Sequence, residues 1–197
     1  MPQSRTGRVR VAVLISGAGS NMAALINAAR RAEAPFEVVV VLSNRLDAGG
    51  LAVAEAKGVP AAVVDHLPFG RDRAAHEAAV QTVLEAHDVE VVALAGYMRL
   101  LTPFLVGRWA GRMLNIHPSL LPKYPGLDTH ARAIAAGDAE AGCTVHLVTE
   151  GVDDGPVLGQ AIVPVQPDDT PASLAQRVLT AEHALYPRVL ADFCRQA

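Results

Sequence analysis

The stretch Val9–Asn21 reads VRVAVLISGAGSN, a run of mostly aliphatic residues that leads directly into a glycine-rich turn. The run Val9–Ile15 is rich in β-branched side chains, which is typical of a buried strand. Residues 22–31 follow the turn, are rich in Ala and Leu and contain no Gly or Pro, which predicts a helix. A strand, a glycine-rich turn and a helix in this order predict the first unit of an α/β fold.

The same alternation continues along the chain. Further strands are predicted at 36–42, 61–64, 89–95 and 113–116, and helices at 50–57 and 73–87. These strands are apolar on both faces, which indicates a parallel sheet covered on both sides. Residues 144–148 and 157–165 are separated only by a short turn and are expected to pair antiparallel. A last helix is expected to open at Thr170-Pro171 and to bury an apolar stripe made of Leu174, Val178, Ala181, Leu185 and Val189.

The sequence therefore predicts a Rossmann-like α/β fold, an open and mostly parallel sheet with helices on both faces and an antiparallel C-terminal strand pair. With 197 residues and no linker or repeat, residues 1–197 are expected to form a single domain. The basic segment Met1–Arg10 and the short apolar run after it do not match a secretory signal, and no run is long enough to span a membrane. We expect a cytoplasmic protein.

Charge and cysteine content exclude further classes. The net charge of −3 gives no overall attraction to nucleic acid. Cys143 and Cys194 are widely separated and predict free thiols, Cys143 as a small core residue.

The glycine-rich turn Gly17–Asn21 lies where a strand meets a helix, a place where backbone N–H groups and the helix dipole favour a phosphate. It is not a dinucleotide fingerprint, because Met22 stands where the third glycine would be and the next strand ends in Ser43-Asn44 without an acidic residue. It is not a P-loop either, since no Gly-Lys-Ser/Thr follows. A helix cap without any ligand explains the motif about as well.

Residues 114–126 read LNIHPSLLPKYPG and place two polar side chains at the end of a buried strand. Asn115 and His117 are two apart and should project from the same face, and Pro118 should end the strand. An amide and an imidazole at one point can stabilise an oxyanion and move a proton. An isolated pair of this kind is more often an ordinary hydrogen-bonded strand end.

The wider pattern favours the catalytic interpretation. Residues 117–126 (HPSLLPKYPG), 145–149 (VHLVT) and 152–157 (VDDGPV) resemble the folate-dependent formyltransferases. Within that family the resemblance is closest to the branch that formylates 5'-phosphoribosylglycinamide in purine biosynthesis. It extends from Val13 to His183. It implies direct transfer of the formyl group of 10-formyltetrahydrofolate to the amine of the ribonucleotide, through a tetrahedral oxyanion. The N-terminal half would bind the ribonucleotide and the C-terminal half would bind folate and carry the chemistry.

The resemblance also implies roles for individual residues. The catalytic set is Asn115, His117 and Asp153, with Asp154 the weaker choice of the two adjacent acids. The ribonucleotide-binding set is Gly19, Ser20, Asn21 and Glu182. The folate-binding set is Arg73, Met98, Arg99, Leu100, Leu101 and Asn115. No metal is expected, and His130 and His146 are interpreted as structural because no metal-ligand spacing links the histidines.

Several alternatives remain at this level. Methionyl-tRNA formyltransferases and formyltetrahydrofolate hydrolases share the chemistry, but typically with an additional C-terminal or N-terminal domain. A phosphate-binding module without catalysis would keep the turn at 17–21 but would not need polar residues at both 115 and 117. A nicotinamide-dependent oxidoreductase is disfavoured by the missing fingerprint. We expect small-molecule substrates, no nucleic-acid or membrane partner, and a monomer or weak homodimer.

Overall fold

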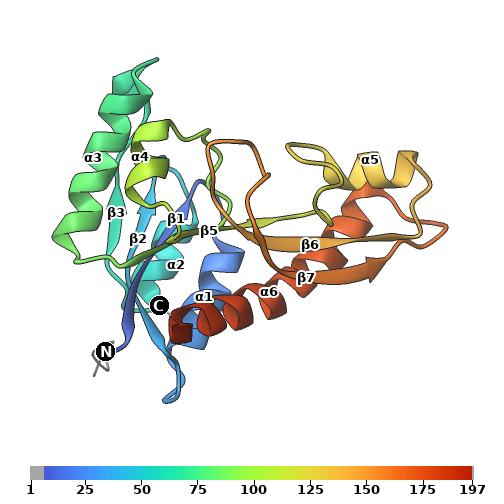
Figure 1. Ribbon diagram of the computed structural model, residues 1–197, viewed down its shortest axis with the longest axis horizontal. Helices are drawn as coiled ribbons and strands as arrows, with labels where there is room; N and C mark the ends of the chain where they lie inside the picture. The colour runs from blue at the N-terminus through green and yellow to red at the C-terminus, as the bar shows by residue number, and fades with distance from the viewer. Residues whose placement is uncertain (1–6, 197) are drawn as a thin grey trace.

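One seven-stranded sheet organises the computed structural model, which describes residues 7–196 (Figure 1). The strand order is β3-β2-β1-β4-β5-β6-β7, with parallel pairing from β3 to β5 and antiparallel pairing of β5 with β6 and of β6 with β7. The strands are β1 (Val9–Ile15), β2 (Phe36–Ser43), β3 (Ala61–Val63), β4 (Val91–Leu94), β5 (Met113–His117), β6 (Glu140–Leu147) and β7 (Val157–Pro164). The helices are α1 (Ser20–Ala29), α2 (Gly50–Ala56), the short 3₁₀ turn η1 (Leu67–Phe69), α3 (Arg73–Ala86), α4 (Pro103–Arg108), α5 (Thr129–Ala135) and α6 (Pro171–Gln196). The predicted fold class is confirmed.

Helices cover both faces of the sheet because its central strands are apolar on both faces. In β1, Val11 and Val13 belong to a core shared with α1 and α6, whereas Ala12 and Leu14 face the opposite core with α3 and α4. All four side chains are fully buried. Each face of the sheet therefore has its own hydrophobic layer, the arrangement expected of a parallel sheet.

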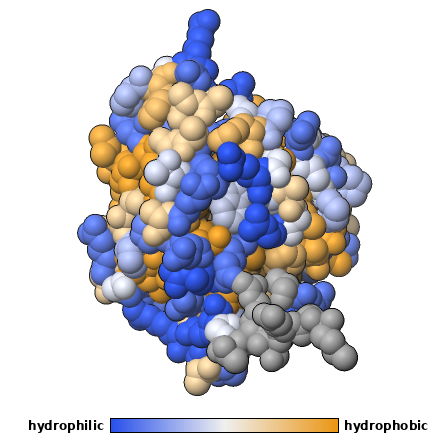
Figure 2. Space-filling view, turned by 60° about the vertical axis from the view of Figure 1, so that its left-hand side comes forward, coloured by the Kyte–Doolittle hydropathy of each residue, from blue (hydrophilic) through white to orange (hydrophobic). Residues whose placement is uncertain are grey.

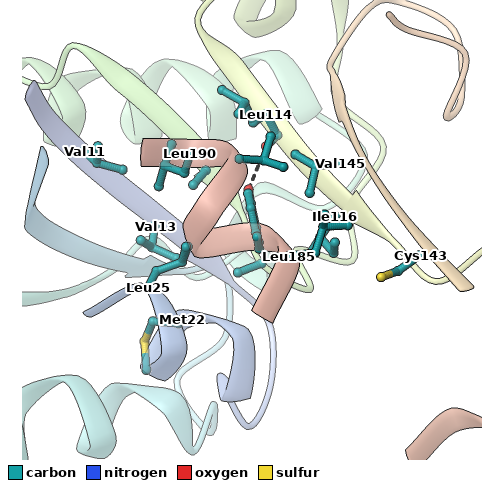
Figure 3. Packing of buried hydrophobic residues seen from close by; sticks show 14 of the residues in the cluster. Val11, Val13, Met22, Leu25, Leu114, Ile116, Cys143, Val145, Leu185 and Leu190 are labelled. Carbon is teal, nitrogen blue, oxygen red and sulfur yellow. Dashed lines mark hydrogen bonds between the residues drawn. The ribbon is translucent and has the colours of Figure 1, made fainter. Parts of the chain in front are cut away.

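The long helix α6 joins the parallel and antiparallel parts of the sheet (Figure 1). Leu185 and Leu190 pack among side chains from β1, α1, β5 and β6 (Figure 3). The hydroxyl of buried Tyr186 donates to the carbonyls of Leu94 at 3.1 Å and Leu114 at 3.2 Å. The predicted opening of this helix is confirmed, since the Thr170 hydroxyl accepts a hydrogen bond from the Ser173 N–H at 3.2 Å.

The predicted elements differ from the observed ones mainly at their ends. Helix α1 was expected from residue 22 but begins at Ser20, so its first turn lies against the glycine-rich turn. Strand β6 was expected from residue 144 but begins at Glu140. The short elements η1, α4 and α5 were not predicted.

The strand order reverses between β1 and β4, where successive connections leave toward opposite sides of the sheet. In open α/β sheets, ligands bind outside the carboxyl ends of the strands at this switch point. The residues that follow the two strands are Ser16 and the turn Gly17–Asn21 after β1, and the segment 95–101 after β4. Both belong to the predicted binding regions.

The face drawn in Figure 2 carries hydrophobic and hydrophilic residues interspersed. Within residues 7–196, no helix combines the length and the apolar character needed to cross a membrane. Residues 1–6 of the basic N-terminal segment lie outside the described residues, so the expectation drawn from that segment remains a prediction.

Candidate active site

The predicted catalytic residues meet at the carboxyl end of β5. Asn115 and His117 extend from the same face of the strand, as predicted, and both reach Asp153 in the connection between β6 and β7. The Nδ1 atom of His117 lies 3.3 Å from Asp153 Oδ2, and the Nδ2 atom of Asn115 lies 3.5 Å from Asp153 Oδ1. The strand ends at His117, directly before Pro118. The structure thus brings the three residues into one cluster.

The two nitrogens of His117 have different partners. Nε2 lies 2.8 Å from the carbonyl oxygen of Tyr124, and because a carbonyl can only accept, Nε2 carries the hydrogen of this bond. Nδ1 is the nitrogen that faces the carboxylate of Asp153. The residue is almost fully buried, so water competes little with these contacts.

Asp153 is held as an anion beside the imidazole. Burial alone would raise its pKa, but hydrogen bonding to His146 and to the backbone N–H of Gly126, together with the nearby His117 ring, holds the pKa below its ordinary value. The Gly126 N–H donates to Oδ2 at 2.9 Å. Asp154 has another role, since it accepts a hydrogen bond from the Thr149 hydroxyl. Of the two adjacent acids, Asp153 is the one that contacts His117.

His146 lies in this cluster, although the sequence analysis interpreted it only as structural. Antiparallel pairing of β5 and β6 puts it opposite Asn115. Its Nε2 atom lies 3.2 Å from Asn115 Nδ2 and 3.6 Å from Asp153 Oδ1, while Nδ1 lies 2.9 Å from the Leu147 carbonyl. The pairing register of β5 with β6 produces this contact, and the spacing of the histidines carries no such signal.

The glycine-rich turn and Glu182 form a second group of polar residues at the start of α1. Gly19 precedes the helix with φ 74°, a left-handed conformation that favours glycine. The Nδ2 atom of Asn21 donates to Glu182 Oε2 at 2.6 Å, while Asn21 Oδ1 is buried without a hydrogen-bond partner among residues 7–196. Glu182 is only 6% exposed, so it is not the solvated helix-face carboxylate that its position on a helix would suggest. Burial raises its pKa, although the bond from Asn21 works against the shift.

The segment 98–101 lies between β4 and α4 and is tied to its neighbours through the backbone. The N–H of Met98 donates to Ser16 Oγ at 2.8 Å, and Arg73 Nη1 lies 3.4 Å from the carbonyl of Leu100. Met98 and Leu100 are 67% and 62% exposed, so neither is a core residue. Exposed apolar side chains on an anchored backbone can contact a flat hydrophobic ligand.

Two buried polar side chains that the sequence analysis did not select also hold this segment. Ser16 Oγ donates to Asn44 Oδ1 at 2.5 Å while it accepts from Met98, and Glu77 accepts from the N–H of Thr102 at 2.7 Å. Ser16 also donates its own N–H to the Gly96 carbonyl at 3.0 Å. Ser16 therefore links the start of the glycine-rich turn to the segment after β4. Single polar residues at strand ends gave no pattern from which this could be predicted.

The three groups lie at the same edge of the sheet, since β1, β4 and β5 are parallel and end there. Within residues 7–196 no group of three or more His, Cys, Asp or Glu side chains is arranged to hold a metal ion. The expectation that the site uses no metal remains a prediction.

Comparisons with known proteins agree with this arrangement. The family model described as "Formyl transferase" matches residues 9–190. Phosphoribosylglycinamide formyltransferase of Escherichia coli (strain K12) is 44% identical over 185 residues, which cover 94% of this chain and 87% of that protein. The trifunctional purine biosynthetic protein adenosine-3 of Drosophila melanogaster is 49% identical over 186 residues, and this chain spans only 14% of its length.

Solved structures give the same result in three dimensions. The crystal structure of phosphoribosylglycinamide formyltransferase from Brucella melitensis is similar with a TM-score of 0.91 and 52% identity, covering 95% of this chain and 96% of that one. Glycinamide ribonucleotide transformylase 1 from Symbiobacterium toebii has a TM-score of 0.93 and 43% identity, covering 98% of this chain and 90% of that one. By sequence and by structure, the chain belongs to the formyl transferase family.

Proposed function

We propose that this chain transfers the formyl group of 10-formyltetrahydrofolate to the amine of 5'-phosphoribosylglycinamide in purine biosynthesis. The observation that carries the proposal is the cluster of Asn115, His117 and Asp153 at the carboxyl end of β5. It lies at the same sheet edge as an anion-suited turn and an anchored apolar segment. Membership of the family and the names of similar proteins support the same reaction.

The reaction follows from the chemistry of the cluster. The substrate amine attacks the formyl carbon, a new C–N bond forms, and the carbonyl oxygen becomes an oxyanion. Protonated His117 and the amide of Asn115 stabilise this oxyanion, which then collapses as the bond to the folate nitrogen breaks. Overall, one proton moves from the attacking amine to the departing folate nitrogen, with the His117–Asp153 pair as its carrier.

The observed distances allow His117 and Asn115 to exchange their contacts with Asp153 for bonds to the oxyanion. The contacts of Asp153 with His117 Nδ1 at 3.3 Å and with Asn115 Nδ2 at 3.5 Å are long for hydrogen bonds. A developing oxyanion would offer both donors a shorter, charge-assisted bond. The bond from His117 Nε2 to the Tyr124 carbonyl is short at 2.8 Å and keeps the ring in place during this change.

We propose that the two substrates bind at the two sides of this cluster. Gly19, Ser20 and Asn21 would bind the phosphate at the start of α1, and Glu182 would contact the same ribonucleotide. Arg73 and the segment Met98–Leu101, with Asn115, would bind the folate. A large part of the rate enhancement would come from holding the two substrates in register.

The remaining expectations are part of the same proposal. We place the enzyme in the cytoplasm, acting on small-molecule substrates as a monomer or weak homodimer. Residues 1–197 would form a single formyltransferase domain. The reaction would need 10-formyltetrahydrofolate as co-substrate and no metal.

The test is formyl transfer followed by folate absorbance, with and without the ribonucleotide. The proposal predicts folate release only when 5'-phosphoribosylglycinamide is present, with formylated ribonucleotide as the product. Release of folate without the ribonucleotide would identify a hydrolase instead. Absence of reaction in both mixtures would contradict the proposed activity and favour a binding module.

A further inference from the structure

The segment 118–128 lies against the catalytic cluster at two points. The Tyr124 carbonyl accepts the Nε2–H of His117 at 2.8 Å, and the Gly126 N–H donates to Asp153 at 2.9 Å. One short piece of backbone thus contacts both members of the proposed proton carrier. The position of residues 124–126 therefore decides how the His117 ring faces Asp153.

The backbone at Tyr124 is in an unfavourable conformation. Its φ is 55°, in the left-handed region that side chains other than Gly and Asn rarely adopt. Such a conformation persists only when the surrounding contacts determine it. Contacts of Tyr124 must therefore stabilise this conformation. The local hydrogen bond from the Ser119 hydroxyl to the Tyr124 carbonyl is long at 3.3 Å, so a further contact is needed.

The carboxylate of Asp138, which lies outside the catalytic cluster, provides this contact. Asp138 lies between α5 and β6, where its backbone N–H donates to the Ala133 carbonyl at 3.1 Å. The Tyr124 hydroxyl donates to Oδ2 at 2.8 Å and Lys123 Nζ donates to Oδ1 at 3.0 Å. These bonds, Lys123 first, hold the pKa of Asp138 below its ordinary value, so the carboxylate is charged at neutral pH.

The surroundings of Asp138 indicate that it stabilises the neighbouring segment and does not bind a ligand. The guanidinium of Arg132 lies 5.1 Å from the centre of the Tyr124 ring and covers it. The cavity next to Tyr124 and Asp138 measures about 10 Å³, which leaves room for at most one water molecule. Asp138 therefore serves this segment of the chain.

We propose that Asp138 is a positioning residue for the reaction: by holding the Tyr124 hydroxyl, it fixes the carbonyl that receives His117 Nε2–H and thereby orients the imidazole toward Asp153. The kinetic part of this inference rests on the proposed function. Asp138 would act through Tyr124, since its side chain bonds to Tyr124 and Lys123.

Four variants distinguish the effect of the Tyr124 hydroxyl bond from that of the Lys123 ion pair. Asp138→Ala removes both bonds, and Tyr124→Phe removes only the hydroxyl bond while the ring and its backbone carbonyl remain. Lys123→Met removes only the ion pair. Asp138→Asn keeps an oxygen acceptor for the Tyr124 hydroxyl. Asp192→Ala is the matched control, because Asp192 forms an exposed ion pair with Arg195 at 2.7 Å on α6.

The measurements are kcat and KM for both substrates, thermal unfolding to correct for the folded fraction, and ¹⁵N NMR of labelled histidine rings. The His117 signals are identified by their loss in His117→Gln. For Asp138→Ala and Tyr124→Phe we expect a fall in kcat of roughly 10-fold to 100-fold, the range for a misplaced catalytic group, with KM nearly unchanged. The His117 ring signals should shift in the same two variants. Asp138→Asn, Lys123→Met and Asp192→Ala should behave like the wild type.

Each other result would overturn the inference. Wild-type kcat and unshifted His117 signals in Asp138→Ala would show that the ring needs no such support. A lower kcat with unshifted His117 signals would indicate a purely structural role. Loss of activity in Asp138→Asn equal to that in Asp138→Ala would assign the effect to Lys123. Because the NMR signals do not depend on turnover, a wild-type chain without formyl transfer would refute the proposed function and leave the positioning of His117 open to the same test.

Discussion

At the scale of single residues, the site depends on buried side chains whose hydrogen bonds leave little freedom. His117 uses Nε2 to bind a backbone carbonyl and presents Nδ1 to Asp153. Asn115 is held by His146 and Asp153. Asp153 thus contacts three polar side chains, and its low pKa keeps it ionised beside them. Under the proposed function, we expect the chemistry to require the cluster as a whole.

Replacing His146 tests this view of the cluster. In His146→Ala the Asn115 amide loses the partner at 3.2 Å that helps to orient it. We expect kcat to fall by roughly 10-fold to 100-fold because a misplaced donor stabilises the oxyanion poorly, with KM much less affected. His87→Ala is the control, since within residues 7–196 the His87 ring bonds to the Val83 carbonyl of α3, away from the cluster, and its backbone bonds to Arg10 and Leu84 are kept. Equal kcat and KM in the two variants would show that His146 does not support the reaction.

Glu182 allows a prediction about pH. Burial raises its pKa above the ordinary value of 4.5, so the folded protein keeps a proton that the unfolded chain has already lost. The free energy of unfolding of the wild type therefore falls as the pH rises from the ordinary pKa through the raised one. The glutamine in the Glu182→Gln variant does not titrate, so the free energy of unfolding of this variant lacks that decrease. Its Tm should exceed that of the wild type by a margin that grows with pH across this window and is constant above it.

The measurement is thermal unfolding of the two proteins side by side from about pH 4 to neutrality, where the other titrating groups contribute equally. A Tm difference that does not vary with pH would show that Glu182 does not titrate differently in the folded state.

At the scale of elements, the start of α1 fits against the start of α2 too closely for a side chain at Gly19. A Cβ atom there would lie 3.0 Å from the Gly50 Cα and 3.0 Å from the Met22 Cε, and the backbone has φ 74°. Gly19→Ala should lower the free energy of unfolding by about 1 kcal/mol or more and raise KM for the ribonucleotide, because the turn must shift.

Gly111→Ala is the matched control for this variant. Gly111 has φ 73°, but a Cβ atom there would meet nothing within 4 Å. It should show a similar backbone penalty without any change in KM for the ribonucleotide. Unchanged KM in Gly19→Ala, measured in the same assay, would contradict the assignment of the turn to the phosphate.

The elements differ in how well the sequence predicts them. Strand β1 was predicted at its observed bounds because a β-branched run ends abruptly at Ser16-Gly17. Helices α4 and α5, six and seven residues long, were not predicted, because about two turns show little periodicity; α2, as short as α5, was predicted from the strand–helix alternation around it. In the site, the proximity of Asn115 and His117 follows from strand geometry alone. The contacts of His146, Ser16 and Asp138 depend on register and loop conformation, which a single sequence does not encode locally.

At the scale of the whole molecule, the order of the strands explains why the site forms where it does. The parallel strands β1, β4 and β5 end at one edge, and the switch between β1 and β4 opens a place for ligands there. The antiparallel addition of β6 and β7 brings Asp153 and His146 to the end of β5. The parallel part of the sheet thus carries the turns proposed to bind the substrates, and the antiparallel part completes the proposed catalytic cluster.

The most direct test of the central claim compares the wild type with His117→Ala and Asp153→Asn in ribonucleotide-dependent formyl transfer. We expect both variants to remain folded and to bind the substrates, while kcat falls by roughly 10²-fold to 10⁴-fold, the range for a positioned acid–base group. Near-normal turnover in either folded variant would contradict the account, because the chemistry would then take place without the cluster at the end of β5.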